Sequence, residues 1–452
     1  MHILKGYTKQ EISWMMYDWA NSAHSVIIVT LLPIFFDTVA GYTADSVSSM
    51  STWGYATSIA MLIVALAAPF LGVFGDIRGM RKKLFSFFML LGVAACAGMA
   101  FTPGMDFTSG PMAAGKVATL ILVLYIVSVI GFDASAIYYD AFLTDVTIED
   151  RMDKVSTMGY GLGYIGGSTI PLLIFLIMNL VGVPMLTCLA FVFGLTAVWW
   201  LAFSLPLLKN CEQTSGKPYE KGDVARSIKG VGTTIKEIIA NKPMLIYILS
   251  YFFYIDGVHT VISMATTYGT NLGLDSTGMM LALLLVQILG LPFCLLYIKC
   301  SEKFGARTMV GFGICVYMFI CIFAFFMNSL WQFWVLAVLC ATSQGGIQAL
   351  SRSMYGKLIP DKDRSGEFFG FFDIFGKFSS IMGPALVGVV SSVVANGMLG
   401  AQGLTAQTAT AEQINVINAQ SSHYGILSII IIIIVGAVLY FGFLPKAEHA
   451  KQ

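Results

Sequence analysis

The chain has 452 residues, of which 57% are hydrophobic and 11% are charged. Soluble globular proteins spend about 25% of their residues on charge, so water is not the main solvent of this chain. A net charge of +1 gives no indication of a nucleic-acid partner. The eight cysteines form no CxxC pair, so we expect them to pack rather than to bind metal, and we expect no cofactor.

Apolar runs of about 18 to 25 residues recur along the whole chain, and a hydrocarbon core about 30 Å thick requires that length of a helix. The runs lack the polar alternation of outer-membrane strands, and the first is too long and too polar for a cleaved signal sequence. We therefore predict an all-α membrane protein with twelve transmembrane helices, near 12–40, 50–74, 84–102, 116–142, 155–180, 183–206, 243–270, 276–298, 308–328, 330–351, 367–393 and 424–444.

The basic residues are distributed asymmetrically between the predicted loops. If the N-terminus is cytoplasmic, all 26 lysines and arginines lie on the cytoplasmic side except Lys116, in an outer loop, and Lys377, inside a span. Cytoplasmic loops carry an excess of these residues, so we expect both termini in the cytoplasm. We expect a monomer in the plasma (cytoplasmic) membrane.

A polar segment at 209–242 separates six runs from six others, and three motifs recur in the same order on both sides of it. His-Ser-Val-Ile from His24 matches His-Thr-Val-Ile from His259. An acid, a glycine and an arginine keep their places between the loops at 75–81 and 301–307. Asp150, Arg151, Gly163 and Pro171 match Asp363, Arg364, Gly376 and Pro384. The matches indicate an internal duplication.

The duplication predicts two six-helix bundles, at 1–208 and 243–452, joined by a cytoplasmic linker at 209–242. Residues 394–422 contain no lysine or arginine and are rich in alanine, glutamine and threonine. We expect them to form a flexible external loop.

Ionisable residues occur only in some of the predicted spans. A charge at the bilayer centre costs about 2.5 to 3.5 kcal/mol on insertion scales, so such residues usually face a cavity. Spans 3, 6, 9 and 12 contain none, whereas those nearest the middle of a span lie in spans 1, 4, 7 and 11, and Arg352 lies at the end of span 10. The candidate residues for binding a solute or a proton are Asn21, His24, Asp133, Asp256, His259, Gln344, Gln348, Arg352, Asp373 and Lys377.

Lys377 lies about ten residues into its span, near the midplane. There it could bind an anionic group of a substrate or respond to a proton; the alternative is a pair with Asp373, one turn earlier. Asp133 is a candidate proton carrier, or else pairs with a cation across the bundle. For His24 and His259, interhelical hydrogen bonding is the alternative to substrate or proton handling.

Gln344, Gln348 and Arg352 are spaced by four and share one stripe of span 10. Amides suit a polar solute, and arginine suits a carboxylate or phosphate. For Arg352 the alternative is a side chain that extends to the headgroup region.

Motifs typical of enzymes are either absent from the sequence or misleading. The pattern Gly161-x-Gly163-x-x-Gly166 fits a dinucleotide motif but lies in a membrane helix and follows no strand. Gly159, Gly163 and Gly167 at spacing four indicate instead a face that packs closely against a neighbouring helix. The sequence has no P-loop, GxSxG or HExxH motif, so we predict that the protein is not an enzyme.

Two six-helix halves running in the same direction resemble the major facilitator superfamily. GDIRGMRKK at 75–83 is similar to the signature loop between its helices 2 and 3. The vacuole-effluxer-like branch is resembled by five further stretches, YDWANSAHS at 17–25, YYDAFLTDV at 138–146, GYGLGYIGG at 159–167, QGGIQALSRS at 344–353 and FFGFFDIFGKF at 368–378.

The resemblance implies a secondary transporter that moves a small polar solute by alternating access, and we expect protons as the coupling ion. An amino acid or similar zwitterion is the leading candidate, because the branch includes fungal vacuolar amino-acid effluxers. A non-transporting solute sensor or interaction protein and a lipid or glycolipid flippase remain alternatives on this fold.

The signature loop also implies a cytoplasmic gate that holds one state of the transporter. The duplicated loop extends this expectation to the second half, and Asp18 is assigned to the gate because it lies near the cytoplasmic end of its span. The gate candidates are Asp18, Gly75, Asp76, Arg78, Gly79, Arg81, Glu302, Gly305 and Arg307.

Overall fold

The computed structural model describes residues 4–43, 49–218, 223–404 and 408–444. Within these ranges twelve helices are long and apolar enough to cross a membrane, which confirms the predicted all-α membrane fold. The chain divides into two compact units. Unit 1 comprises residues 1–234 and 359–374, and unit 2 comprises 235–358 and 375–452.

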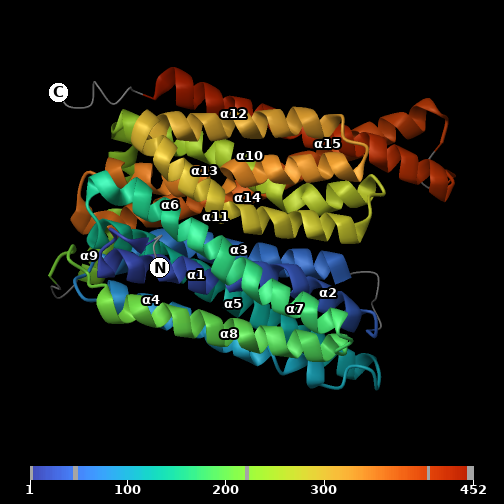
Figure 1. The fold of residues 1–452 in the computed structure, drawn as a ribbon, viewed down its shortest axis with the longest axis horizontal. Coiled ribbons are helices and arrows are strands. Elements are labelled where there is room, and N and C mark those ends of the chain that lie inside the picture. Colours follow the sequence, from blue (N-terminus) through green and yellow to red (C-terminus); the bar gives the residue numbers. More distant parts are fainter. Residues whose placement is uncertain (1–3, 44–48, 219–222, 405–407, 445–452) are drawn as a thin grey trace. The chain divides into compact units, whose positions relative to one another are not determined.

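Unit 1 contains the first six spans, coloured blue to green in Figure 1. The first and fifth spans each contain a π-helical turn, η2 (His24–Ile28) and η6 (Tyr164–Thr169), between two α-helical parts. The short turns η4 (Thr102–Gly104) and η5 (Glu149–Arg151) connect neighbouring spans. The α-helices are α1 (Lys9–Ala23), α2 (Val29–Ala40), α3 (Ser49–Gly75), α4 (Arg81–Met99), α5 (Pro111–Val146), α6 (Met152–Gly163), α7 (Ile170–Leu180) and α8 (Met185–Asn210).

Unit 2 contains the last six spans, although the fifth of them, α14 (Ser365–Ala401), has its first ten residues in unit 1. The α10 helix packs against α15, and α13 packs against both α11 and α12. These helices are α10 (Lys242–Asn271), α11 (Ser276–Phe304), α12 (Ala306–Phe325), α13 (Leu330–Leu358) and α15 (Ala411–Val438), and the π-helical turn η8 (Leu439–Phe443) follows α15.

The glycine face predicted at the start of the fifth span is confirmed, and its neighbour is the first span. A Cβ atom added at Gly163 would lie 2.6 Å from Ser22 Oγ, and one at Gly167 would lie 2.7 Å from the carbonyl oxygen of Trp19. Only glycine allows α1 and the fifth span to approach this closely. The sequence GYGLGYIGG therefore serves helix packing.

The prediction of a flexible loop over 394–422 is wrong for most of its described part. α14 continues to Ala401, and α15 begins at Ala411 with a capping box in which Thr410 and Gln413 bond each other's backbone N–H groups. Alanine and glutamine are strong helix formers, which favours helix beyond the apolar run. The 37 residues of α14 span about 55 Å, more than a hydrocarbon core, and Figure 1 shows this hairpin reaching past its neighbours in unit 2.

The duplicated loops share a positive-φ glycine. Gly79 has φ +80° and its sequence counterpart Gly305 has φ +81°, angles that favour glycine. The loops differ in length, because α3 ends at Gly75 and α4 begins at Arg81, whereas Gly305 alone separates α11 from α12. A second pair of counterparts, η5 and η7 (Lys362–Arg364), precedes α6 and α14.

The segment between α8 and α10 differs from a simple linker. Residues 211–218 run along unit 1, where Ile77 and Lys217 form an isolated parallel β-bridge. The helix α9 (Asp223–Ala240) follows, and residues 219–222 lie outside the described part. Residues 359–374, which the sequence assigned to the second bundle, belong to unit 1.

Candidate functional site

Asp76, in the loop between α3 and α4, holds the first turn of α14. Its Oδ1 accepts a hydrogen bond from the backbone N–H of Gly366 at 2.7 Å, and its Oδ2 accepts one from Glu367 at 2.8 Å. The first N–H groups of a helix lack intrahelical partners and carry partial positive charge, so a carboxylate is favoured there. Asp76 thus caps a helix that begins almost 290 residues later in the chain.

Arg81 lies beside Asp76 and joins three further segments of unit 1. Its side chain is fully buried, and Nη2 donates to Asp76 Oδ1 and to Ser365 Oγ, both at 2.9 Å. Nη1 donates to Asp145 Oδ2 at 2.5 Å and to Ser215 Oγ at 3.2 Å. These five residues, Asp76, Arg81, Asp145, Ser215 and Ser365, are called the Arg81 cluster below.

Asp145 was not among the predicted site residues, although it lies within the stretch YYDAFLTDV at 138–146. Its Oδ1 accepts four hydrogen bonds, from the backbone N–H groups and the hydroxyls of Thr214 and Ser215, at 2.7 to 3.1 Å. One carboxylate oxygen therefore binds the linker and the other binds Arg81. The partners could not be found from sequence because the linker shows no periodicity that would place it here.

The charges of the Arg81 cluster do not cancel. Asp76 and Asp145 bring two carboxylates to one buried guanidinium. Burial raises the pKa of Asp76 to about 7, although Arg81 and the N–H groups of Glu367 and Gly366 act to lower it. Asp76 therefore titrates near neutral pH.

Glycines let α14 approach α3 beside the cluster. A Cβ atom at Gly366 would lie 2.6 Å from the carbonyl oxygen of Gly72, and one at Gly370 would lie 2.5 Å from that of Ala68. Both obstacles are backbone atoms, which cannot move aside as a side chain can. In the sequence, the signal for this contact is the spacing of four between Gly366 and Gly370.

The remaining gate candidates of the first half have different surroundings. Gly75 faces the ring of Tyr138, 2.8 Å from where its Cβ would be. Arg78 is exposed, and its backbone N–H donates to the carbonyl of Lys217 at 2.9 Å. Asp18 lies inside unit 1, where the Tyr139 hydroxyl donates to its Oδ2 at 2.8 Å.

The corresponding loop of unit 2 uses its arginine differently. Arg307 Nη2 donates to the carbonyl of Leu444 at 2.7 Å, and the guanidinium lies 6.0 Å from the ring centre of Tyr440. Glu302 is exposed and Gly305 forms the turn. Arg307 therefore binds the end of the last span.

His24 is packed inside unit 1. Its Nε2 lies 3.1 Å from Ser128 Oγ on α5, and its ring stacks on Phe132 at 4.7 Å between centroids. These contacts confirm an interhelical hydrogen bond, the alternative set against a substrate role. The neighbouring candidates Asn21 and Asp133 are also buried, with 8% and 2% of their surface exposed.

Four of the predicted residues come together in unit 2. The side chain of Gln348 on α13 hydrogen-bonds His259 on α10, and the charge of Lys377 on α14 acts on the same imidazole. Gln348 Nε2 also donates to the carbonyl of Gln344, one turn away, at 3.1 Å. This group, the Lys377 group, offers one cation and several neutral donors and acceptors.

Asp256 on α10 contacts the middle of α14. It is fully buried, and its Oδ1 accepts from the Gly383 N–H at 2.9 Å and from the Thr260 hydroxyl at 3.3 Å. Pro384 follows directly inside the helix, where a proline disturbs the regular ladder. Asp256 Oδ2 has no hydrogen bond with the residues that the structure describes.

The last two candidates lie farther along α13 and α14. Arg352 is buried, with 3% of its surface exposed, one turn beyond Gln348. Asp373 is half-buried in the part of α14 that belongs to unit 1.

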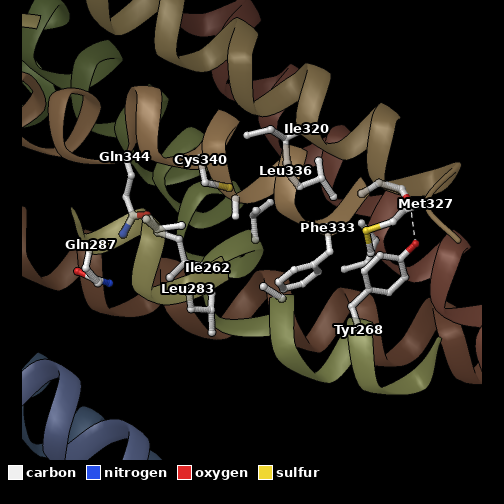
Figure 2. Close-up of a pocket in the computed structure, with 16 residues that line it drawn as sticks. Ile262, Tyr268, Leu283, Gln287, Ile320, Met327, Phe333, Leu336, Cys340 and Gln344 are labelled. Atoms are coloured by element: carbon white, nitrogen blue, oxygen red, sulfur yellow. Dashed lines mark hydrogen bonds between the residues drawn. The ribbon is translucent and has the colours of Figure 1, made fainter. Parts of the chain in front are cut away.

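An apolar cavity of about 90 Å³ in unit 2 ends at one member of the Lys377 group. Phe333, Leu336 and Met327 line its body, while Gln287 and Gln344 form a polar end, as Figure 2 shows. Gln287 was not predicted; its buried Oε1 has no hydrogen bond within the described part of the chain. The cavity therefore combines an apolar body with amide groups.

The sequence matches the family described as "Vacuole effluxer Atg22 like" over residues 39–150 and 144–400. It is 40% identical over 452 residues to "Uncharacterized MFS-type transporter YxiO" of Bacillus subtilis (strain 168), covering 98% of this chain and 96% of that protein. The chain belongs to the vacuole effluxer Atg22-like family. It is thus a multi-pass membrane protein of the major facilitator superfamily and not an enzyme.

More distant relatives of this Atg22-like chain include fungal proteins and solved transporters. "Autophagy-related protein 22-1" of Penicillium rubens is 25% identical over 274 residues, which cover 55% of this chain and about half, 46%, of that protein. The structure of the proton:xylose symporter XylE superposes with a TM-score of 0.71 at 13% identity, covering 97% of this chain and 95% of the other. A bacterial homologue of ferroportin gives 0.61 at 16% identity, with coverage of 95% and 98%. These solved structures show that the fold is that of the superfamily.

Proposed function

We propose that this chain is a secondary active transporter that moves a small zwitterion, with an amino acid as the leading candidate, by alternating access coupled to protons. The Lys377 group carries the proposal. It brings a cation, an imidazole and the amide of Gln348 from three helices of unit 2 together within the membrane-spanning part of the chain. Placing polar groups inside the bilayer costs free energy, so those that occur there usually face a cavity and mark a solute or ion pathway.

The chemistry of the Lys377 group suits one end of an amino acid. Lysine presents three donors to a carboxylate, and the glutamine amides can donate to the carboxylate or accept from an ammonium group. Gln344 also borders the apolar cavity, which could take the uncharged part of such a solute. The family description, vacuole effluxer, supports export of a solute as the direction of transport.

Two buried carboxylates support proton coupling. Asp256 is fully buried with one oxygen lacking a described partner, and Asp133 has 2% of its surface exposed. We assign both the role of proton carriers, because ionisable side chains inside membrane spans mark solute and proton pathways.

The Arg81 cluster supports alternating access. It fixes the start of α14 to unit 1 through Asp76 and Ser365, and these bonds can be broken without unfolding a helix. We assign it the role of a gate that holds one state and opens in the other.

Uptake of labelled amino acids into proteoliposomes under an imposed pH gradient tests this function. We expect Lys377→Ala to lower the initial rate about tenfold or more, because a charge-assisted contact to the carboxylate is lost. Asp133→Asn should weaken the dependence on the gradient. Lys116→Ala, which removes an exposed lysine at the start of α5, is the matched control and should leave the rate unchanged.

Unchanged transport and unchanged pH dependence in both Lys377→Ala and Asp133→Asn would show that the assigned mechanism is wrong. Binding of a solute without any flux would favour a sensor instead.

A further inference from the structure

The central linker contacts the α3–α4 loop through Gln213. Its Oε1 accepts from the backbone N–H groups of Gly79 at 2.9 Å and Arg81 at 3.3 Å. Its Nε2 donates to the carbonyl of Gly75 at 3.0 Å. One amide thus ties both ends of the loop that carries Asp76.

The next two linker residues bind the other side of the Arg81 cluster. Thr214 and Ser215 occupy Asp145 Oδ1 with their N–H and hydroxyl groups, so Oδ2 is held toward Arg81. The Ser215 hydroxyl also accepts from Arg81 Nη1. The rotamer of Asp145, and through it the position of the guanidinium, therefore depends on the linker.

Gly216 completes the contact at a position that other residues would strain. Its φ is +113°, and a Cβ atom there would lie 2.6 Å from the carbonyl oxygen of Asp76. Its N–H donates to Asp363 Oδ1 at 2.8 Å, just before α14 begins. The linker therefore contacts the loop of Asp76 and the approach to α14 at the same place.

Farther along, α9 contacts the first turn of α14 directly. The hydroxyl of Thr234 donates to Glu367 and accepts from Arg364, which itself pairs with Glu367 at 3.0 Å. The linker thus reaches the start of α14 from two points in its sequence.

We propose that the linker is a working part of the gate, in which Gln213, Thr214 and Ser215 position Asp145 and Arg81 and so set how firmly the start of α14 is held. The proposal rests on the alternating-access function proposed above. A linker that only connected two bundles would need length but no particular side chains. Here three consecutive side chains are bonded into the cluster, whereas those of Lys209 and Glu212 just before them are exposed.

Hydrogen–deuterium exchange of the purified full-length protein tests the proposal without a solute. The amides of Gly366 and Glu367 bond to Asp76, so their exchange reports release of α14. We expect Gln213→Ala and Ser215→Ala each to speed this exchange about tenfold, since each loses two or three hydrogen bonds. The matched controls Lys209→Ala and Glu212→Ala should stay within about twofold of the wild type.

A pair of variants at Thr214 separates positioning from loss of fold. Thr214→Ser keeps the hydroxyl that binds Asp145 and should exchange like the wild type, whereas Thr214→Val removes it and should exchange faster. Both changes are small and Thr214 is exposed, so neither should prevent folding. Gel filtration of each variant confirms that a folded protein is compared.

Transport by the wild type, compared with exchange in the variants, separates this proposal from the proposed function. If the wild type transports and exchange at Gly366 and Glu367 is unchanged in Gln213→Ala, Ser215→Ala and Thr214→Val, the linker is only a tether and the proposal is overturned. If the wild type moves no solute, the proposed function fails, while faster exchange in these variants still shows that the linker holds the start of α14.

Discussion

Asp76 is the residue on which the contact between the α3–α4 loop and α14 depends most. It bonds two N–H groups of α14 and the guanidinium of Arg81 with two oxygens. Its neighbour Arg78, of similar prominence in the sequence motif, is exposed. The sequence motif predicted the importance of the loop, but only the structure separates these two charges.

The raised pKa of Asp76 predicts that release of α14 depends on pH. An exposed aspartate titrates near 3.9 and Asp76 near 7, so the docked state binds the proton more tightly. The contribution to docking is therefore complete below about pH 4 and is lost as the pH rises through about 7. Exchange of the Gly366 and Glu367 amides, corrected for its intrinsic pH dependence, should rise between about pH 5 and 8.

Asp76→Asn should make this corrected exchange independent of pH, because the amide does not titrate while its carbonyl can still accept from α14. Arg78→Ala is the control and should keep the dependence of the wild type. Corrected exchange that falls with rising pH in the wild type would contradict the assignment to Asp76.

At the scale of elements, hydropathy located the spans but not their ends. The α15 helix starts at Ala411, whereas the apolar run begins near residue 424, because capping and helix propensity rather than apolar character determine the outer part. The glycine pattern of the fifth span was readable because its repeat is regular. The spacing of Gly366 and Gly370 indicates a close-packing face on α14, but no sequence pattern marks the α3 backbone atoms that this face meets.

That contact predicts different effects for two glycines of the same helix. Gly366→Ala places a methyl group 2.6 Å from the Gly72 carbonyl and should lower the free energy of unfolding by about 1 to 3 kcal/mol. Gly397→Ala meets nothing within 4 Å and should raise it by about 0.5 to 1 kcal/mol, since alanine favours the helix. Thermal unfolding in detergent measures both, and equal midpoints for the two variants would rule out the close approach.

For the whole molecule, the duplication was the most informative sequence feature. It predicted two similar six-helix halves, and the structure adds that Gly79 and Gly305 both have a positive φ and that short turns precede both α6 and α14. It did not predict that the two copies differ in function: Arg81 joins a buried cluster, whereas Arg307 binds the end of the last span. The φ angle is kept at the equivalent glycines Gly79 and Gly305, whereas Arg81 and Arg307 have different partners.

The candidate solute-binding residues also differ between the two halves. His24 and His259 are sequence counterparts, yet His24 packs on Phe132 while His259 joins Gln348 and Lys377. Unit 2 gathers several predicted residues into one polar group, so the two histidines have different surroundings.

The central claim is that this chain moves a solute across the bilayer. Counterflow tests it most directly: proteoliposomes loaded with a high concentration of unlabelled amino acid are diluted into a trace of the labelled one, with no pH gradient. We expect label to enter the lumen transiently above its outside concentration, through exchange by the wild-type protein. Label that binds at no more than one molecule per protein and never enters the lumen would contradict the claim.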